Sequence, residues 1–289
     1  MFLQQIINGL TMGTTYSLLA LGYSMIFSML SFINFAHGDV AMVGAYVTWY
    51  LLSKLNISFF PACLAAILTS AIVGVLMEKI GYKPIRRSPR LSSVIVSLGF
   101  SFIIATGVQI LWGTEPQQMP PLGNVTTFTF GNITFNSTQI WVFTLAILIM
   151  LLLQIYMNKT KIGMAIRAVS LDKDTAGLMG VNVNNIISFT FAMGSAIAAV
   201  SAIMMAVYYG ALYPSMGRVV GMKGFTAVIL GGIGSIPGAM VGGVLMGVIE
   251  SLAGAILNAQ VRDAVSFIVL IIMLLVKPSG LFGKEIVKE

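Results

Sequence analysis

Residues 186–209 read IISFTFAMGSAIAAVSAIMMAVYY, and no side chain among them is charged. A helix needs about 20 consecutive apolar residues to cross the hydrocarbon core of a bilayer, so this run is long enough to span it. Comparable apolar runs cover residues 6–30, 61–77, 93–112, 140–157, 237–257 and 264–276. Because 57% of all residues are hydrophobic, we predict an all-α fold, a polytopic transmembrane helical bundle.

Two shorter apolar segments lie between these runs. The first covers residues 40–52, and the second covers residues 224–235 and contains Gly231, Gly232 and Gly234. Short, glycine-broken segments at membrane depth are typical of half-helices that line a cavity. We therefore expect about eight spans with two short broken or re-entrant segments, one in each half of the chain.

Charged residues are few and clustered. Of 289 residues, 25 are charged, and 17 of these lie in residues 78–90, 159–174 and 277–289. Lys and Arg next to apolar spans mark the cytoplasmic side of a membrane. We expect these stretches inside and the connector at residues 113–139, which has one charge, outside. The side of the N-terminus stays open.

The net charge of +7 raises the question of a nucleic-acid partner. The basic residues lie within a few positions of apolar spans, where they act as topology signals. Membrane lipid is therefore the expected environment, and no nucleic-acid partner is expected.

The chain has no features of an enzyme. Its longest polar stretches are about thirty residues, whereas an ordinary domain has at least about 50. No G-x-x-x-x-G-K-[ST] phosphate loop occurs, and the single cysteine, Cys63, cannot form a metal cluster by itself. We expect no catalytic residues, no bound metal and no cofactor in this chain. Uphill transport would draw its energy from another subunit or from an ion gradient.

Polar groups within apolar runs are candidates for a solute pathway, because ionisable groups in lipid are costly and usually face a cavity. Asn34, His37 and Asp39 lie together around Gly38. Asp39 alternatively caps the helix that starts there. For His37 and Asn34, a gate and an interfacial hydrogen bond are both open.

Glu250 is an isolated carboxylate in the run at residues 237–257. Such a group has to be protonated, paired or hydrated. Arg262 is a possible partner but lies beside Asp263, so structural pairing and transport both stay open. Arg218, before the second short segment, is expected at the membrane interface, as is Lys223.

The inner loop at residues 158–185 mixes apolar and charged residues. Residues 164–170 and 172–180 each predict a short helix. The two helices would form a compact knob on the cytoplasmic side, either a docking surface or a solvated connector.

Four groups of residues resemble a known family. These groups are SFINFAHGD at residues 31–39 with GAY at 44–46, GMAIRA at 163–168 with Asp172 and AGLMG at 176–180, FTAVILGGIGSIPG at 225–238, and KPSGLFG at 277–283. In this order and spacing, the chain resembles the LivH-type permease subunits of branched-chain amino acid ABC importers over essentially its whole length.

The resemblance implies one permease domain over residues 1–289 in the bacterial cytoplasmic (inner) membrane. It also implies a LivM-like permease as partner, two cytosolic ATPase subunits that bind the ATP, and a periplasmic or lipid-anchored amino-acid-binding protein. The loop at 158–185 would be the coupling loop. Its expected ATPase-coupling residues are Ala165, Arg167, Asp172, Asp174, Ala176 and Gly180.

The expected pathway follows from the two short segments and the isolated carboxylate. Its residues are Asn34, His37, Gly38, Asp39, Gly44, Gly231, Gly232, Gly234 and Glu250. The solutes that the resemblance implies are branched-chain or other apolar amino acids. A permease for urea or short amides and an ion-coupled secondary transporter are the alternatives. Homodimeric and heterodimeric pairing with the second permease both stay open.

Overall fold

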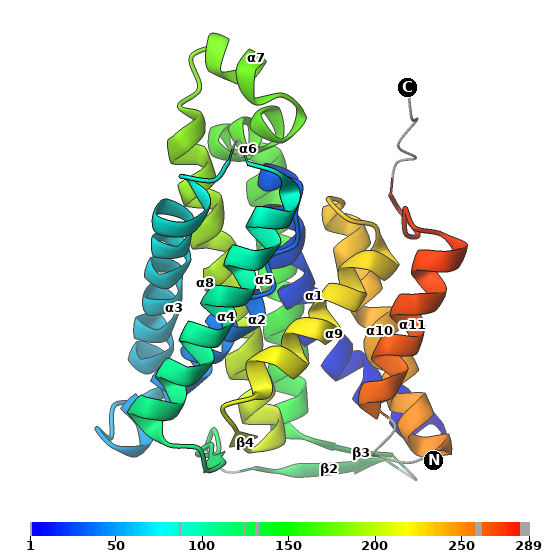
Figure 1. The fold of residues 1–289 in the computed structure, drawn as a ribbon. Coiled ribbons are helices and arrows are strands. Elements are labelled where there is room, and N and C mark those ends of the chain that lie inside the picture. The colour runs from blue at the N-terminus through cyan, green and yellow to red at the C-terminus, as the bar shows by residue number, and fades with distance from the viewer. Residues whose placement is uncertain (1, 87, 124, 131–132, 258–261, 284–289) are drawn as a thin grey trace.

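The computed structural model describes residues 2–86, 88–123, 125–130, 133–257 and 262–283. Within these ranges, nine helices of 15 or more residues form a bundle (Figure 1). They are α1 (Phe2–Leu30), α2 (His37–Ser53), α3 (Phe59–Leu76), α4 (Arg90–Trp112), α5 (Ser137–Lys159), α8 (Val183–Tyr209), α9 (Met216–Gly231), α10 (Ile236–Ile256) and α11 (Arg262–Val276). Helix α3 continues as one π-helical turn, η1 (Met77–Tyr82). The all-α, polytopic prediction is confirmed.

The two ends of the bundle differ. At one end lie two short helices, α6 (Lys161–Leu171) and α7 (Lys173–Leu178), in the position predicted for the inner knob. At the other end lies a hairpin of β2 (Thr127–Phe130) and β3 (Ile133–Asn136), antiparallel with Thr127 opposite Asn136. There too, β1 (Gln117–Gln118) pairs with β4 (Ala211–Leu212). The sequence did not predict these strands.

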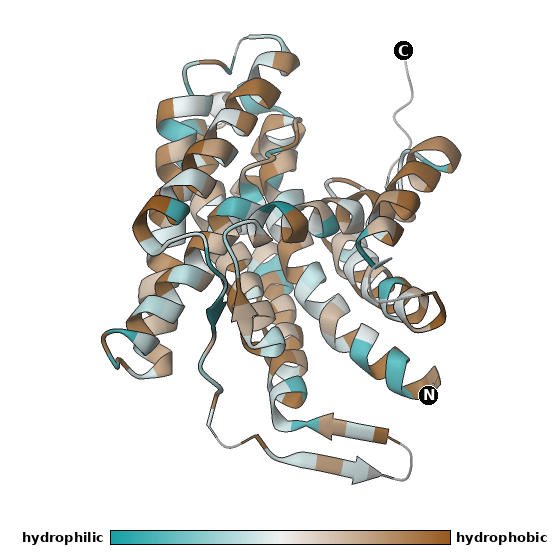
Figure 2. Cartoon of the chain, turned by 60° about the horizontal axis from the view of Figure 1, so that its bottom comes forward, coloured by the Kyte–Doolittle hydropathy of each residue, from teal (hydrophilic) through white to brown (hydrophobic). Residues whose placement is uncertain are grey.

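Hydrophobicity follows this arrangement. Hydrophobic positions run along most of the helical ribbon, and hydrophilic positions gather in connectors and near the start of α1 (Figure 2). Among the described helices, five are long and apolar enough to cross a membrane: α3 with η1, α4, α5, α8 and α10. The chain is therefore a multi-pass membrane protein.

The two short segments differ from each other in the structure. Helix α2 has 17 residues and α9 has 16, and neither is interrupted inside. At 1.5 Å per residue they extend about 25 Å, less than the roughly 30 Å hydrocarbon core. The segment at residues 40–52 lies within α2, so the prediction of a break inside it is wrong. The segment at residues 224–235 contains the end of α9 and the turn before α10, so its predicted glycine break is present. The backbone is irregular in this turn, because Gly232 and Gly234 adopt positive φ.

Small residues bring the central helices into close contact. Helix α1 packs chiefly against α10, as GxxxG-type contacts do in membranes. A Cβ added to Gly13 would lie 2.7 Å from the Cα of Val244. Hydrogen bonds add to this contact, since Ser17 Oγ donates to the Met240 carbonyl at 2.6 Å and Ser251 Oγ to the Gln5 carbonyl at 2.7 Å.

Gly13→Ala should lower the free energy of unfolding by about 1–3 kcal/mol, because the new methyl group meets backbone that cannot move aside. Gly107→Ala in α4 is the matched control, since an added Cβ there meets nothing within 4 Å. Thermal unfolding in detergent micelles measures both. Equal melting temperatures for the two variants would show that the α1–α10 contact is not tight.

Candidate functional site

A cavity of about 550 Å³ lies between α4, α9 and α11. Tyr23 of α1 and Phe35, in the connector before α2, also line it. Its volume is within the range of about 300–1,000 Å³ that small-molecule sites usually have. Most of its wall is apolar, and a few polar side chains are placed among the apolar ones.

A lysine between two carboxylates forms part of this wall. Lys223 Nζ lies 2.8 Å from Glu250 Oε1 and 2.9 Å from Asp263 Oδ1. The side chains of Lys223 and Glu250 are 9% and 6% exposed, while that of Asp263 is 61% exposed. The expectation of Lys223 at the membrane interface is wrong, because it lies buried in α9. Glu250 is paired as one alternative proposed, but with Lys223 and not with Arg262.

Arg218 is exposed on the same wall, one turn before Lys223 in α9. Its guanidinium carbon lies 5.7 Å from the centre of the Phe102 ring, a cation–π distance that holds the side chain beside α4. Among the described residues, no carboxylate lies within ion-pair distance of Arg218. The wall therefore carries a positive charge without a direct ion pair among the described residues.

Asp39 lies directly behind the wall. Its Oδ2 accepts a hydrogen bond of 2.5 Å from the hydroxyl of Ser101, which lines the cavity. The helix-cap alternative for Asp39 is wrong, because its side chain bonds α4. Asn34, in the connector before α2, accepts through Oδ1 from the Ala36 N–H at 3.1 Å and from the Tyr82 hydroxyl at 2.8 Å.

His37 and Gly38 are packing residues behind the cavity. His37 is fully buried with its ring centre 4.4 Å from that of Tyr23, edge to face. A Cβ at Gly38 would lie 2.5 Å from the Cα of Gly221, so the start of α2 rests on α9. Between described residues, neither ring nitrogen of His37 has a hydrogen-bond partner.

The remaining predicted pathway residues lie elsewhere. Gly44 packs on Ala199 of α8. Gly231, Gly232 and Gly234 form the turn between α9 and α10, beside the C-terminal segment, where Phe282 N donates to the Gly231 carbonyl at 2.9 Å. None of the nine predicted pathway residues is part of the cavity wall itself, although Asp39 and Glu250 hold residues that are.

The knob formed by α6 and α7 confirms the two short helices predicted in the inner loop. Asp172 caps α7, accepting from the Asp174 and Thr175 N–H groups at 2.9 and 3.1 Å and from the Thr175 hydroxyl at 2.7 Å. The Thr175 hydroxyl and these N–H groups lower the pKa of Asp172 below its ordinary value. Arg167 donates to the Met157 carbonyl and so ties α6 to the end of α5.

The other four predicted coupling residues differ from one another in how far they are exposed. Asp174 is exposed, Ala165 is half-buried, Ala176 is buried, and Gly180 ends the turn after α7 with φ of +86°. The most exposed apolar side chains of the knob are Leu171, Leu178 and Met179, at 87, 89 and 81%. Sequence reasoning missed them, although apolar residues inside a charged loop were a usable signal.

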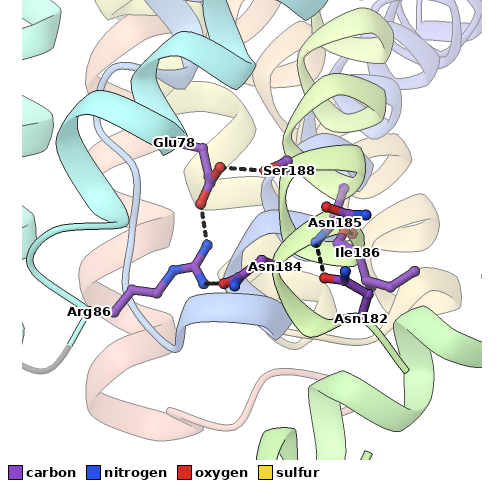
Figure 3. Close-up of polar contacts among 8 residues, drawn as sticks. Glu78, Arg86, Asn182, Asn184, Asn185, Ile186 and Ser188 are labelled. Atoms are coloured by element: carbon purple, nitrogen blue, oxygen red, sulfur yellow. Dashed lines mark hydrogen bonds and ion pairs between the residues drawn. The ribbon is translucent and has the colours of Figure 1, made fainter. Parts of the chain in front are cut away.

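A polar cluster connects η1, at the end of α3, to the start of α8 (Figure 3). Glu78 in η1 is fully buried and accepts from Arg86 and, at 2.6 Å, from the Ser188 hydroxyl. Arg86 also donates to Asn184 Oδ1 at 2.7 Å, at the start of α8. Burial and the nearby charge of Arg86 lower the pKa of Lys173, the first residue of α7. The loop after η1, which holds Arg86, therefore lies close to the start of α8 and to Lys173 at the start of α7.

Comparison with known proteins shows which family the chain matches and which proteins are similar to it. The family model described as "Branched-chain amino acid transport system / permease component" matches residues 5–274. The chain is 38% identical over 303 residues to the high-affinity branched-chain amino acid transport system permease protein BraD of Pseudomonas aeruginosa, covering 100% of this chain and 98% of that protein. It is also 38% identical to LivH of Escherichia coli (strain K12), a permease protein of the same kind of system, covering 100% and 97%.

Among solved structures, PsaBC from Streptococcus pneumoniae in complex with Fab aligns with a TM-score of 0.53 and 12% identity, covering 97% of this chain and 94% of that one. At this identity the likeness concerns the fold alone.

Arg86→Gln should lower the free energy of unfolding by about 3–5 kcal/mol, because it leaves the buried Glu78 carboxylate without its counter-charge. Glu78→Gln with Arg86→Gln should recover much of this loss, since no buried charge is then unpaired. Thermal unfolding in detergent micelles measures the cycle. A double variant that loses the sum of the two single losses would contradict a direct pair.

Proposed function

The chain belongs to the family of branched-chain amino acid transport system permease components, and on that premise we propose that it forms one half of a solute pathway. It is the permease subunit of an ABC importer, and its relatives are permease proteins of high-affinity branched-chain amino acid transport systems. The other half of the pathway would be a second, related permease, and the solute a branched-chain or other apolar amino acid.

The cavity between α4, α9 and α11 carries this proposal. Arg218 and Asp263 are both exposed on its wall, within helices that lie among membrane spans. Hydrocarbon cannot solvate a charge, so charged residues at membrane depth face protein or a water-filled cavity. A second permease over this wall would cover the charges and leave a hydrated path between the subunits.

The two ends of the bundle suit the expected partners. Two cytosolic ATPase subunits would dock on the knob, where Leu171, Leu178 and Met179 are exposed. A binding protein would deliver solute at the hairpin end. Gln4 fixes that hairpin to α1 by accepting from the Thr134 N–H and donating to the Thr134 carbonyl, both at 2.8 Å.

We further propose a topology with the N-terminus outside. The knob and the start of α1 lie at opposite ends of the bundle, and the long helices alternate in direction between them (Figure 1). With the knob inside, the nine long helices of the described ranges would give nine passes in the cytoplasmic membrane, where the sequence suggested about eight.

An ion-coupled secondary transporter is the less favoured alternative. Such a carrier needs groups that bind and release the coupling ion, yet Glu250 is paired with Lys223 and Asp39 is bonded to Ser101. His37 is buried against Tyr23. These groups do not form a relay across the bundle.

Leucine uptake into proteoliposomes tests the proposal. With the second permease, both ATPases, internal ATP and the liganded binding protein, leucine should accumulate against its gradient. The chain alone should build no gradient under a proton, sodium or potassium gradient, because it has no energy source of its own. Accumulation by the chain alone would establish the secondary transporter instead.

Leu178→Ser should weaken ATPase association by about tenfold or more, the equivalent of 1.4 kcal/mol, because an exposed apolar side chain of the knob is lost. Leu55→Ser is the matched control, since Leu55 is 54% exposed before α3, away from the knob. Co-purification of the ATPase and solute-stimulated ATP hydrolysis are the measurements. Unchanged values for Leu178→Ser would remove the knob from the docking surface.

A further inference from the structure

The charged residues of the cavity wall differ in whether their charge is already paired within the chain. Lys223 already contacts two carboxylates, so its own charge is satisfied within the chain. Asp263 forms an ion pair with Lys223 through Oδ1, and its side chain is 61% exposed. Arg218 has no carboxylate partner among the described residues. One cationic group and one carboxylate oxygen are therefore available toward the cavity.

We propose that Arg218 and Asp263 form a polar subsite for the two charged ends of a zwitterionic α-amino acid. The solute carboxylate would bind the Arg218 guanidinium, which suits it by a two-pronged hydrogen-bonding geometry. The solute ammonium would bind the open oxygen of Asp263. This subsite rests on the proposed function and specifies how the same cavity recognises its solute.

A bound α-amino acid has a length of the same order as the backbone offset between the two ends of the proposed subsite. Arg218 precedes Lys223 by five residues of α9, an axial offset of about 7.5 Å. Asp263 is fixed at the Lys223 end of this offset by the 2.9 Å contact. Two charge-assisted hydrogen bonds of about 2.8 Å and an N–Cα–C unit of about 2.5 Å together bridge about 8 Å.

The rest of the wall suits an apolar side chain. Leu98 and Phe102 of α4, Met222 of α9 and Phe267 of α11 line the cavity. Burial of an aliphatic side chain there is favourable by roughly 25 cal/mol per Å² of apolar area. An uncharged solute such as urea would leave both charges without a counter-charge, so this wall selects against urea and short amides.

The subsite is also suited to release. Both charged groups are partly exposed and set on different helices, α9 and α11, so a relative movement of these helices would separate them. A transport pathway needs binding that is strong enough for entry and weak enough for exit. The satisfied Lys223–Glu250 pair next to the subsite stays in place when the solute leaves.

Leucine uptake by the complete importer in proteoliposomes tests the subsite. Arg218→Gln and Asp263→Asn should each lower the uptake rate by about tenfold or more, the usual loss for a hydrogen bond to a charged group. Arg218→Lys and Asp263→Glu keep the charge and should retain much of the rate. ATP hydrolysis stimulated by the liganded binding protein should persist in all four variants, because the knob is unchanged.

Matched controls remove a charge outside the cavity. Glu115→Gln in the connector after α4 and Lys54→Gln after α2 change exposed residues away from the wall, and both should transport at the rate of the unsubstituted protein. Unchanged uptake in Arg218→Gln and Asp263→Asn would overturn the subsite while leaving the proposed function intact. Loss of co-purification with the second permease in these variants would also overturn it, because the charges would then serve pairing. Absence of uptake by the unsubstituted importer would instead contradict the proposed function.

Discussion

Charge compensation inside the membrane governs the arrangement of this protein. Lys223 lies within 3 Å of a carboxylate from α10 and another from α11, so three helices meet around one buried cation. An unpaired charge at this depth would be costly, and the pairing therefore fixes how α9, α10 and α11 pack. Arg218, on the same helix, is not compensated in this way. In the proposed importer, the carboxylate of the solute would supply the counter-charge of Arg218.

The end of the bundle that carries the knob also contains a buried carboxylate that is paired. Glu78 is buried in a π-helical turn, and Arg86 and Ser188 satisfy its two oxygens. Single π-helical turns often occur at functional positions. Here hydrogen bonds join the turn at the end of α3 to the start of α8.

Several features followed from the sequence because they depend on local composition. Apolar runs identified the long helices, Asp172 was placed at the start of α7, and the charged connectors marked one end of the bundle. The pairing of Lys223 with Glu250 could not be predicted, because these residues are 27 positions apart and on different helices. The continuity of α2 was also missed, because glycine content alone does not distinguish a helix that packs closely on its neighbours from one that is interrupted. From the sequence, Arg218 was expected at the membrane interface and Asp263 was only a neighbour of Arg262, and packing alone shows that they face a common space.

The central claim is that the wall between α4, α9 and α11 faces a hydrated path in the assembled importer. A cysteine at position 267, made as Phe267→Cys in a Cys63→Ser background, tests it directly with a charged, membrane-impermeant thiol reagent. Leu68→Cys in the same background is the reference, because Leu68 is 55% exposed on α3 and is away from the cavity. The account predicts rapid modification at position 267, at a rate that changes when ATP is bound, and little modification at position 68. Equal resistance of both positions to the charged reagent, with equal reaction toward a lipid-soluble one, would place the wall in lipid and contradict the account.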